Sequence, residues 1–130
     1  MKLSRFKVNN QAAEEGVWVD AGEGLRLLVA RMSNKGAQDF IRRETRRNKR
    51  HSTGSIADAA MESATKRAIA NHVLLGWENL LGDDEQQIPF SANKALEIFE
   101  EFPDFLTMVI EYATDIDLFR DETMEQSAGN

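Results

Sequence analysis

The stretch of sequence that most constrains the fold is residues 68–90, which reads AIANHVLLGWENLLGDDEQQIPF. An apolar run with helical spacing ends at Leu81, and the acidic turn Gly82-Asp83-Asp84-Glu85 interrupts it before the chain returns towards Phe90. Trp77 and Phe90 carry rings large enough to hold both ends of this turn against a core. The sequence therefore predicts a helix as far as Leu81, followed by a structured loop rather than a linker.

The composition is typical of a soluble globular protein, with 42% hydrophobic and 29% charged residues. The cysteine count is 0, so we expect neither a disulfide nor a thiolate metal site. No apolar run approaches the roughly 20 residues that a membrane-spanning helix needs. The first residues also lack the apolar segment of a secretory signal. We therefore expect no association with a membrane.

Alternating apolar residues predict a β-hairpin near the N-terminus. Val17-Trp18-Val19 is β-branched and aromatic, and apolar residues alternate in the segment LRLLVARM that begins at Leu25. Gly22 and Gly24 lie between the two segments and can take the positive φ angles that tight connections require. Since the second segment is apolar on both faces, we expect a helix to cover one face of the hairpin and another part of the chain to cover the other.

Four helices are predicted after the hairpin, over residues 35–49, 56–81, 91–102 and 104–121. Ser33-Asn34 and Ser91 offer N-caps for the first and third helices, and Pro103 suits the first turn of the last. The fold class is therefore α+β, mainly helical, with an N-terminal β-hairpin over about 17–32 followed by about four α-helices over about 34–121. We expect residues 1–121 to form a single domain and residues 122–130 to form a flexible tail.

No arrangement of residues in the sequence indicates a catalytic, cofactor or metal site. His51 and His72 are the only histidines, and neither has a partner at metal-ligand spacing. Asp83-Asp84-Glu85 lacks the alternating ligands and the glycine of a calcium loop. Gly22-Glu23-Gly24 is only a fragment of a dinucleotide-binding fingerprint. We therefore expect a protein that is not an enzyme and that needs no cofactor.

Charge is segregated along the chain, although the formal net charge is only −6. Basic residues crowd one short segment that comprises Arg42, Arg43, Arg46, Arg47, Lys49 and Arg50. Acidic residues dominate the last third of the chain: Glu97, Glu100, Glu101, Asp104, Glu111, Asp115, Asp117, Asp121, Glu122 and Glu125.

Three interpretations of this segregation are open. The charges can simply lie on two solvated helix faces. Alternatively, the basic segment of one copy attracts the acidic region of another, which makes it a candidate self-association site. The basic segment could also bind phosphates, but no aromatic residue interleaves its cations and no recognition-helix pattern follows, which argues against nucleic acid as a partner.

The last predicted helix has a wide apolar arc. Its first stripe consists of Leu106, Val109, Ile110 and Ala113, and a second stripe beside it consists of Phe105, Met108, Tyr112, Ile116 and Phe119. An arc of this width exceeds what one small core needs, so the second stripe is the candidate partner-binding surface. The alternative is a central helix packed on two sides, in which both stripes belong to the core.

Residues 75–105 carry a pattern of turns and aromatic residues that resembles a known family. The pattern is Gly76-Trp77-Glu78-Asn79-Leu80-Leu81, then Asp83-Asp84, then Ile88-Pro89-Phe90-Ser91, then Phe102-Pro103-Asp104-Phe105. It resembles the tail assembly chaperones of long-tailed, siphovirus-like bacteriophages, with the predicted hairpin and helix in the order expected for that family. Members often have glycine after the acidic pair, where this chain has Glu85 and Gln86.

The resemblance implies a non-enzymatic protein that binds the tape-measure protein and helps to recruit tail-tube subunits while the tail is built. It also implies that the protein acts in the cytoplasm of the infected bacterial host and is absent from the mature virion. Many such genes make a longer product by ribosomal frameshifting, and this chain would be the short product. Two alternatives stay open: a small nucleic-acid-binding regulator that uses residues 42–50, and a structural component of the phage tail.

Overall fold

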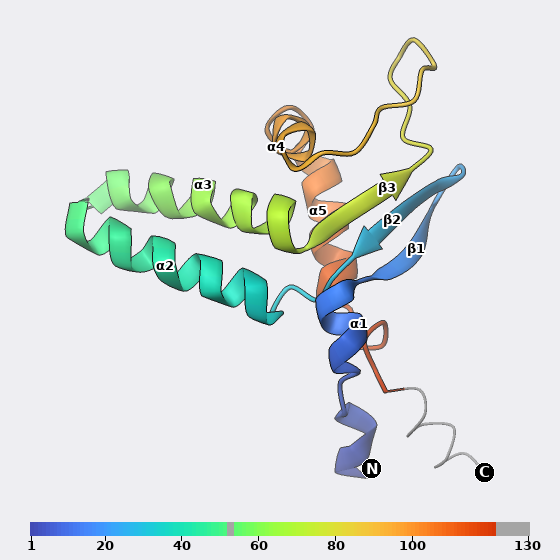
Figure 1. Cartoon of the computed structure of the whole chain (residues 1–130), viewed down its shortest axis with the longest axis horizontal. Helices are drawn as coiled ribbons and strands as arrows, with labels where there is room; N and C mark the ends of the chain where they lie inside the picture. The colour runs from blue at the N-terminus through green and yellow to red at the C-terminus, as the bar shows by residue number, and fades with distance from the viewer. Residues whose placement is uncertain (52–53, 122–130) are drawn as a thin grey trace.

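A three-stranded antiparallel sheet in the order β1-β2-β3 lies at the centre of the fold. It comprises β1 (Val17–Gly22), β2 (Leu25–Val29) and β3 (Leu74–Glu78). The computed structural model describes residues 1–51 and 54–121, apart from the side chains of residues 49–51 and 55. Helices make up most of the remaining described chain (Figure 1), so the predicted fold class, α+β and mainly helical, is confirmed.

The predicted N-terminal hairpin is confirmed as β1 and β2, joined by a turn with two glycines at positive φ. β2 ends at Val29 rather than near residue 32, because the backbone N–H groups of Ala30 and Met32 donate to carbonyls that lie outside the strands. Ala30 donates to the carbonyl of Val73 at 2.7 Å, and Met32 donates to that of Ala113 at 2.9 Å. These bonds tie the end of the hairpin to two segments that lie much later in the sequence.

The predicted helix over residues 56–81 is wrong in its last part. Helix α3 (Gly54–His72) ends before strand β3, in which Trp77 and Glu78 pair with residues of β2. Gly76 disfavours helix by about 1 kcal/mol relative to alanine. In the strand, by contrast, Glu78 pairs with Arg26 across the ladder at 3.1 Å. Pairing with β2 therefore overrides the helical periodicity of this segment.

The remaining elements are η1 (Leu3–Phe6), α1 (Asn10–Glu15), α2 (Lys35–His51), α4 (Ala92–Glu101) and α5 (Pro103–Ala113). The predicted caps are confirmed. The side-chain oxygen of Asn34 accepts the backbone N–H of Ala37 at 2.9 Å, and the hydroxyl of Ser91 accepts that of Lys94 at 3.0 Å. Pro103 begins α5, as its lack of an N–H group favours.

Helix α5 ends at Ala113, so the predicted helix over residues 104–121 is too long. The hydroxyl of Thr114 donates back to the carbonyl of Ile110 at 2.7 Å, and the carboxylate of Asp115 accepts the backbone N–H of Asp117 at 3.0 Å. Such local bonds offer the backbone an alternative to the helical ladder. The predicted flexible tail over residues 122–130 lies outside the described residues.

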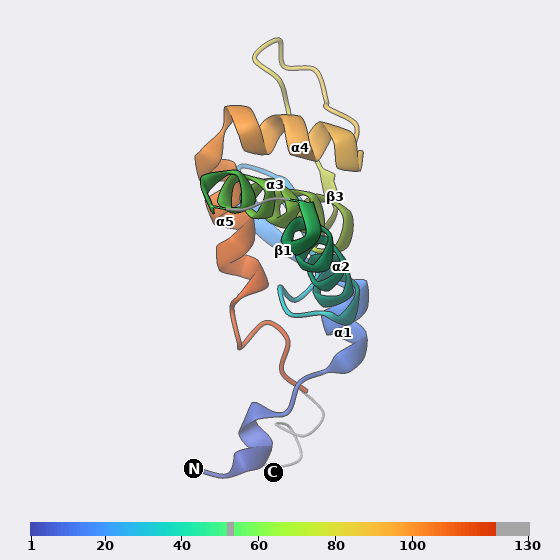
Figure 2. The ribbon, with the colours of Figure 1, turned by 90° about the vertical axis from the view of Figure 1, so that its left-hand side faces the viewer.

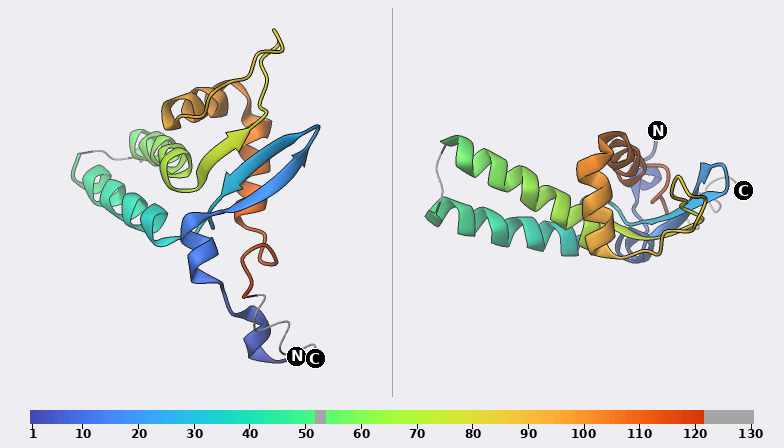
Figure 3. Two further views of the ribbon diagram at one scale, coloured as in Figure 1. Left: turned by 45° about the vertical axis from the view of Figure 1, so that its right-hand side comes forward. Right: turned by 90° about the horizontal axis from the view of Figure 1, so that it is seen from above.

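Helices α2 and α3 form a hairpin that projects from the rest of the molecule (Figures 1 and 3). The second half of α2 has no large apolar side chain to bury, so polar contacts hold it against α3. Asn48 donates to the sulfur of Met61 at 3.1 Å, and Arg67 pairs with Glu44 at 3.4 Å. The cations of α2 are thereby carried away from the sheet.

The core lies where the sheet, α4, α5 and the base of α3 meet. The largest fully buried side chains of the described chain are Phe99, Phe119, Leu27, Ile69, Leu74, Val29, Val73 and Val109. Helix α5 covers one face of the sheet (Figure 1). On the other face Trp18 is 39% exposed beneath the guanidinium of Arg26, which lies 5.0 Å from its ring centroid. The expected covering of both faces is therefore only partly realised.

Candidate functional site

The loop over residues 79–90 is narrow and structured, because backbone hydrogen bonds join its two legs. The N–H of Ile88 donates to the carbonyl of Leu80 at 2.7 Å. At the base of the loop, Trp77 Nε1 donates to the carbonyl of Ile88 at 2.7 Å, and its ring meets that of Phe90 edge to face at 4.8 Å. The predicted aromatic clamp on this loop is confirmed, although Trp77 comes from a strand and not from a helix.

This loop rises beside α4 (Figure 2) and, with the junction of α4 and α5, encloses an apolar groove of about 560 Å³, which we call the elbow groove. The groove is lined by Leu80, Leu81, Gly82, Asp83, Ile88, Ile98, Phe102, Asp104, Phe105 and Met108. Leu81 on the loop is 51% exposed, and Phe102 at the junction is 54% exposed. Large apolar side chains that stay half open to water around a groove are typical of an interaction site.

The rim of the elbow groove is negative. Asp83 on the loop and Asp104 at the start of α5 both line it, and the neighbouring carboxylates of Asp84, Glu85 and Glu101 are exposed. None of these carboxylates forms an ion pair within the part of the chain that the structure describes. The groove therefore suits a partner that presents apolar side chains together with positive charge.

The structure separates the residues of the predicted partner-binding stripe, because α5 ends before the stripe does. Phe105 and Met108 line the elbow groove. Tyr112 lies further along α5, where its hydroxyl donates to the carbonyl of Asp20 at 3.5 Å. Ile116 lies beyond the helix and is 59% exposed, whereas Phe119 is only 1% exposed. The expectation of one continuous stripe is therefore wrong, and only its first two members share a groove.

Sequence reasoning missed most of the groove. Phe102 is exposed at the junction of α4 and α5, where the sequence offers no sign of a groove. Helical spacing predicts that Leu81 ends a helix, but Leu81 lies on the loop, in an isolated bridge with Gln87. The available signal was the pair of apolar residues, Leu81 and Ile88, that flank the acidic turn. This pair indicates that the loop has an apolar side, but it does not identify the segment of the chain that lies opposite that side.

Residues 32–130 match the family described as YdaY prophage protein. The chain belongs to the YdaY prophage protein family. It is therefore a phage-derived protein, as the resemblance in its sequence implied. The whole elbow groove lies within the matched residues, whereas β1 and β2 precede them. Comparisons with curated proteins and with solved structures found no match.

The basic segment of this YdaY-family protein lies on the projecting part of α2. Arg43, Arg46 and Arg47 are exposed and make no ion pair with the described residues, whereas Arg42 pairs with Asp39 at 3.1 Å. We call these four arginines the basic face of α2. The predicted site also included Lys49 and Arg50, whose side chains lie outside the description.

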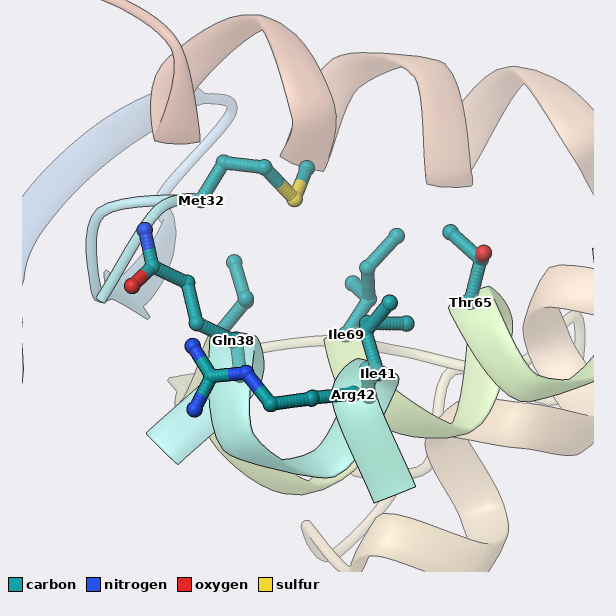
Figure 4. A pocket seen from close by; sticks show the side chains of 9 residues that line it. Met32, Gln38, Ile41, Arg42, Thr65 and Ile69 are labelled. Atoms are coloured by element: carbon teal, nitrogen blue, oxygen red, sulfur yellow. The ribbon is translucent and has the colours of Figure 1, made fainter. Parts of the chain in front are cut away.

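A second hollow of about 550 Å³ lies at the base of the α2–α3 hairpin. Figure 4 shows Met32 across the hollow from Ile41 and Ile69, with Arg42 along its edge. The full lining consists of Met32, Ala37, Gln38, Ile41, Arg42, Thr65, Ala68, Ile69 and Val73. Its floor is made of core residues, and it lacks the exposed aromatic and the paired carboxylates that distinguish the elbow groove in this YdaY-family chain.

The described residues of this YdaY-family chain form neither a metal centre nor a membrane-spanning helix. No group of three or more His, Cys, Asp or Glu side chains among them is arranged to hold a metal ion. None of the helices described there has the length and apolar character to cross a bilayer.

Proposed function

We propose that this YdaY-family protein is a tail assembly chaperone of a long-tailed phage. It binds the tape-measure protein during tail assembly and helps to recruit tail-tube subunits, and it catalyses no reaction. The observation that carries the proposal is the elbow groove, in which Leu81 and Phe102 stay half exposed beside Met108. Phage origin and the resemblance over residues 75–105 add support.

An amphipathic helix of the tape-measure protein fits the chemistry of the elbow groove. Such helices dock by side chains at positions i, i+3, i+4 and i+7, which enter an apolar groove together. Met108 has a flexible, polarisable side chain that adapts to different neighbours, which suits a groove that must accept many similar segments in turn. Asp83 and Asp104 would favour client segments with a lysine or arginine beside the apolar stripe.

The test is co-purification of the tape-measure protein of the same phage with the unmodified chain, with Leu81→Ser/Phe102→Ser and with Ile116→Ser. Ile116 is a matched control because it is similarly exposed but lies outside the groove. We expect only the double variant to lose the tape-measure protein, with little change in melting temperature. Retention by the double variant would contradict the groove as the client site. Failure of the unmodified chain to retain the tape-measure protein would contradict the chaperone function itself.

The proposed function places the protein in the cytoplasm of the infected host and outside the finished particle. Quantitative mass spectrometry of purified virions and of infected-cell lysate measures this directly. A chaperone is present in the lysate and absent from virions. A stoichiometric amount in virions would favour the alternative of a structural tail component.

A second candidate function rests on the exposed arginines of α2. Arg43, Arg46 and Arg47 lie on a projecting helix, where they could contact phosphate groups. A nucleic-acid-binding regulator would bind DNA with an affinity that falls steeply as salt rises, and Arg43→Glu/Arg46→Glu/Arg47→Glu would abolish that binding. We favour the chaperone because the net charge of −6 repels polyanions at long range.

A further inference from the structure

The first seven residues form an arm whose apolar side chains are exposed to solvent. Leu3 is 86% exposed and Phe6 is 52% exposed, and η1, which contains both, buries no residue. The base of the arm is fixed to the body. The N–H of Asp121 donates to the carbonyl of Lys7 at 3.0 Å, and Val8 bridges to Arg120. An ordered turn that presents leucine and phenylalanine to water has a surface that a partner can cover.

The arm is also positive. Lys2, Arg5 and Lys7 alternate with its apolar residues, and none of these side chains forms an ion pair with the described part of the chain. The arm therefore has the two properties that the elbow groove requires of its occupant: large apolar side chains, and cations that can face Asp83 and Asp104.

We propose that the N-terminal arm of one copy docks into the elbow groove of a second copy. Leu3 and Phe6 pack among the exposed and half-buried apolar side chains of the groove, and the cations of the arm face the carboxylates on its rim. The contact concerns this chain alone, so it stands independently of which client the groove binds. A client that fills the groove displaces the arm of the neighbouring copy.

The arm cannot reach the groove of its own chain. Figures 1 and 2 show the N-terminus at the opposite end of the molecule from the loop that forms the groove. Leu3 and Phe6 lie within four residues of Lys7, whose carbonyl is bonded to Asp121, so an extended chain carries them about 14 Å at most from that point. The contact is therefore heterologous, so each added copy leaves one arm and one groove unused, and assembly continues until a ring closes.

The test uses the purified full chain in sedimentation velocity over a range of concentrations. Leu3→Ser/Phe6→Ser removes the arm contact, and Leu81→Ser/Phe102→Ser removes the groove contact. We expect each variant alone to sediment as a monomer of 14.7 kDa, whereas the unmodified chain forms larger species. The exposed-residue control Ile116→Ser should behave as the unmodified chain does.

Mixing the two variants gives the sharpest result. The arm variant keeps an intact groove and the groove variant keeps an intact arm, so an equal mixture should form one-to-one dimers and nothing larger. If the groove variant fails to fold, a fluorescent peptide of residues 1–8 titrated into the arm variant tests the same contact, and it should bind the groove saturably. The proposal is overturned if the unmodified chain is monomeric throughout, if the arm variant still assembles, or if neither the mixture nor the peptide shows binding.

Discussion

Trp77 is the residue on which the geometry of the candidate site most depends. Trp77 is only 7% exposed, and its ring lies edge to face with both Phe90 and Phe105. Its indole N–H donates to the carbonyl of Ile88. One side chain thus fixes the base of the loop to α5, and the loop and α5 supply residues on different walls of the elbow groove. The shape of the groove follows from this anchor.

We expect Trp77→Ala to destabilise the fold by about 3–5 kcal/mol, because it removes a large buried aromatic side chain and one hydrogen bond. The matched control is Trp18→Ala, because Trp18 is partly exposed and its contact with Arg26 is worth about 0.5–1 kcal/mol. Chemical denaturation of both variants gives the comparison. Equal and small losses of stability would show that Trp77 does not anchor the loop.

Glu85 has a backbone conformation that most residues avoid, with φ at 63°. It stands where the resembled chaperones often have glycine, the residue that takes positive φ at least cost. We expect Glu85→Gly to leave the melting temperature unchanged or raise it, and Glu85→Val to lower stability by about 1–2 kcal/mol, because a β-branched residue is strained there. A stabilising Glu85→Val would contradict this description of the turn.

At the scale of elements, local chemistry was predictable and distant pairing was not. Asn34, Ser91 and Pro103 mark helix starts through bonds or steric effects within a few residues, so the sequence alone located them. Strand β3 depends on β2, which lies far earlier in the chain, and helical periodicity hid it. The elbow groove has its walls on the loop, α4 and α5, and so no single stretch of sequence contains it.

Asn34 connects the start of α2 to the end of α3. It is 4% exposed, caps α2 through its oxygen, and donates through its nitrogen to the carbonyls of Arg31 and His72, both at 2.7 Å. We expect Asn34→Ala to cost about 2–4 kcal/mol, since it removes the cap and takes the side-chain donor away from the partly buried carbonyl of His72, whereas the carbonyl of Arg31 keeps the backbone N–H of residue 34. Asn34→Asp keeps the cap but not the donors, so in thermal melts it should also be destabilised. A variant as stable as the unmodified chain would show that this junction is dispensable.

At the scale of the whole molecule, net charge affects how strongly copies of the chain associate. The replacements Arg43→Glu, Arg46→Glu and Arg47→Glu each change the charge by −2, and together they move the net charge from −6 to −12. We expect this variant to associate more weakly than the unmodified chain at low salt, because like-charged copies repel. Sedimentation equilibrium at several salt concentrations measures the difference.

High salt separates two causes of that weakening. At about 0.5 M salt, repulsion between exposed charges is largely screened, so the variant and the unmodified chain should associate equally if the arm and groove make the contact. Persistent loss of association in the variant at high salt would instead identify the basic face of α2 as part of the interface.

The loop over residues 79–90 separates folding from recognition. Its two legs are joined by backbone hydrogen bonds between Leu80 and Ile88 and between Gly82 and Gln86, and its base is held by Trp77. Asp83 and Glu85 at its tip are exposed, and their side chains form no hydrogen bond or ion pair with the described residues, whereas the carboxylate of Asp84 accepts the backbone N–H of Gln86 at 3.1 Å. Under the proposed function, the charges of Asp83 and Glu85 can therefore change, and with them the choice of partner, while the turn closed by Asp84 and the scaffold beneath it stay the same.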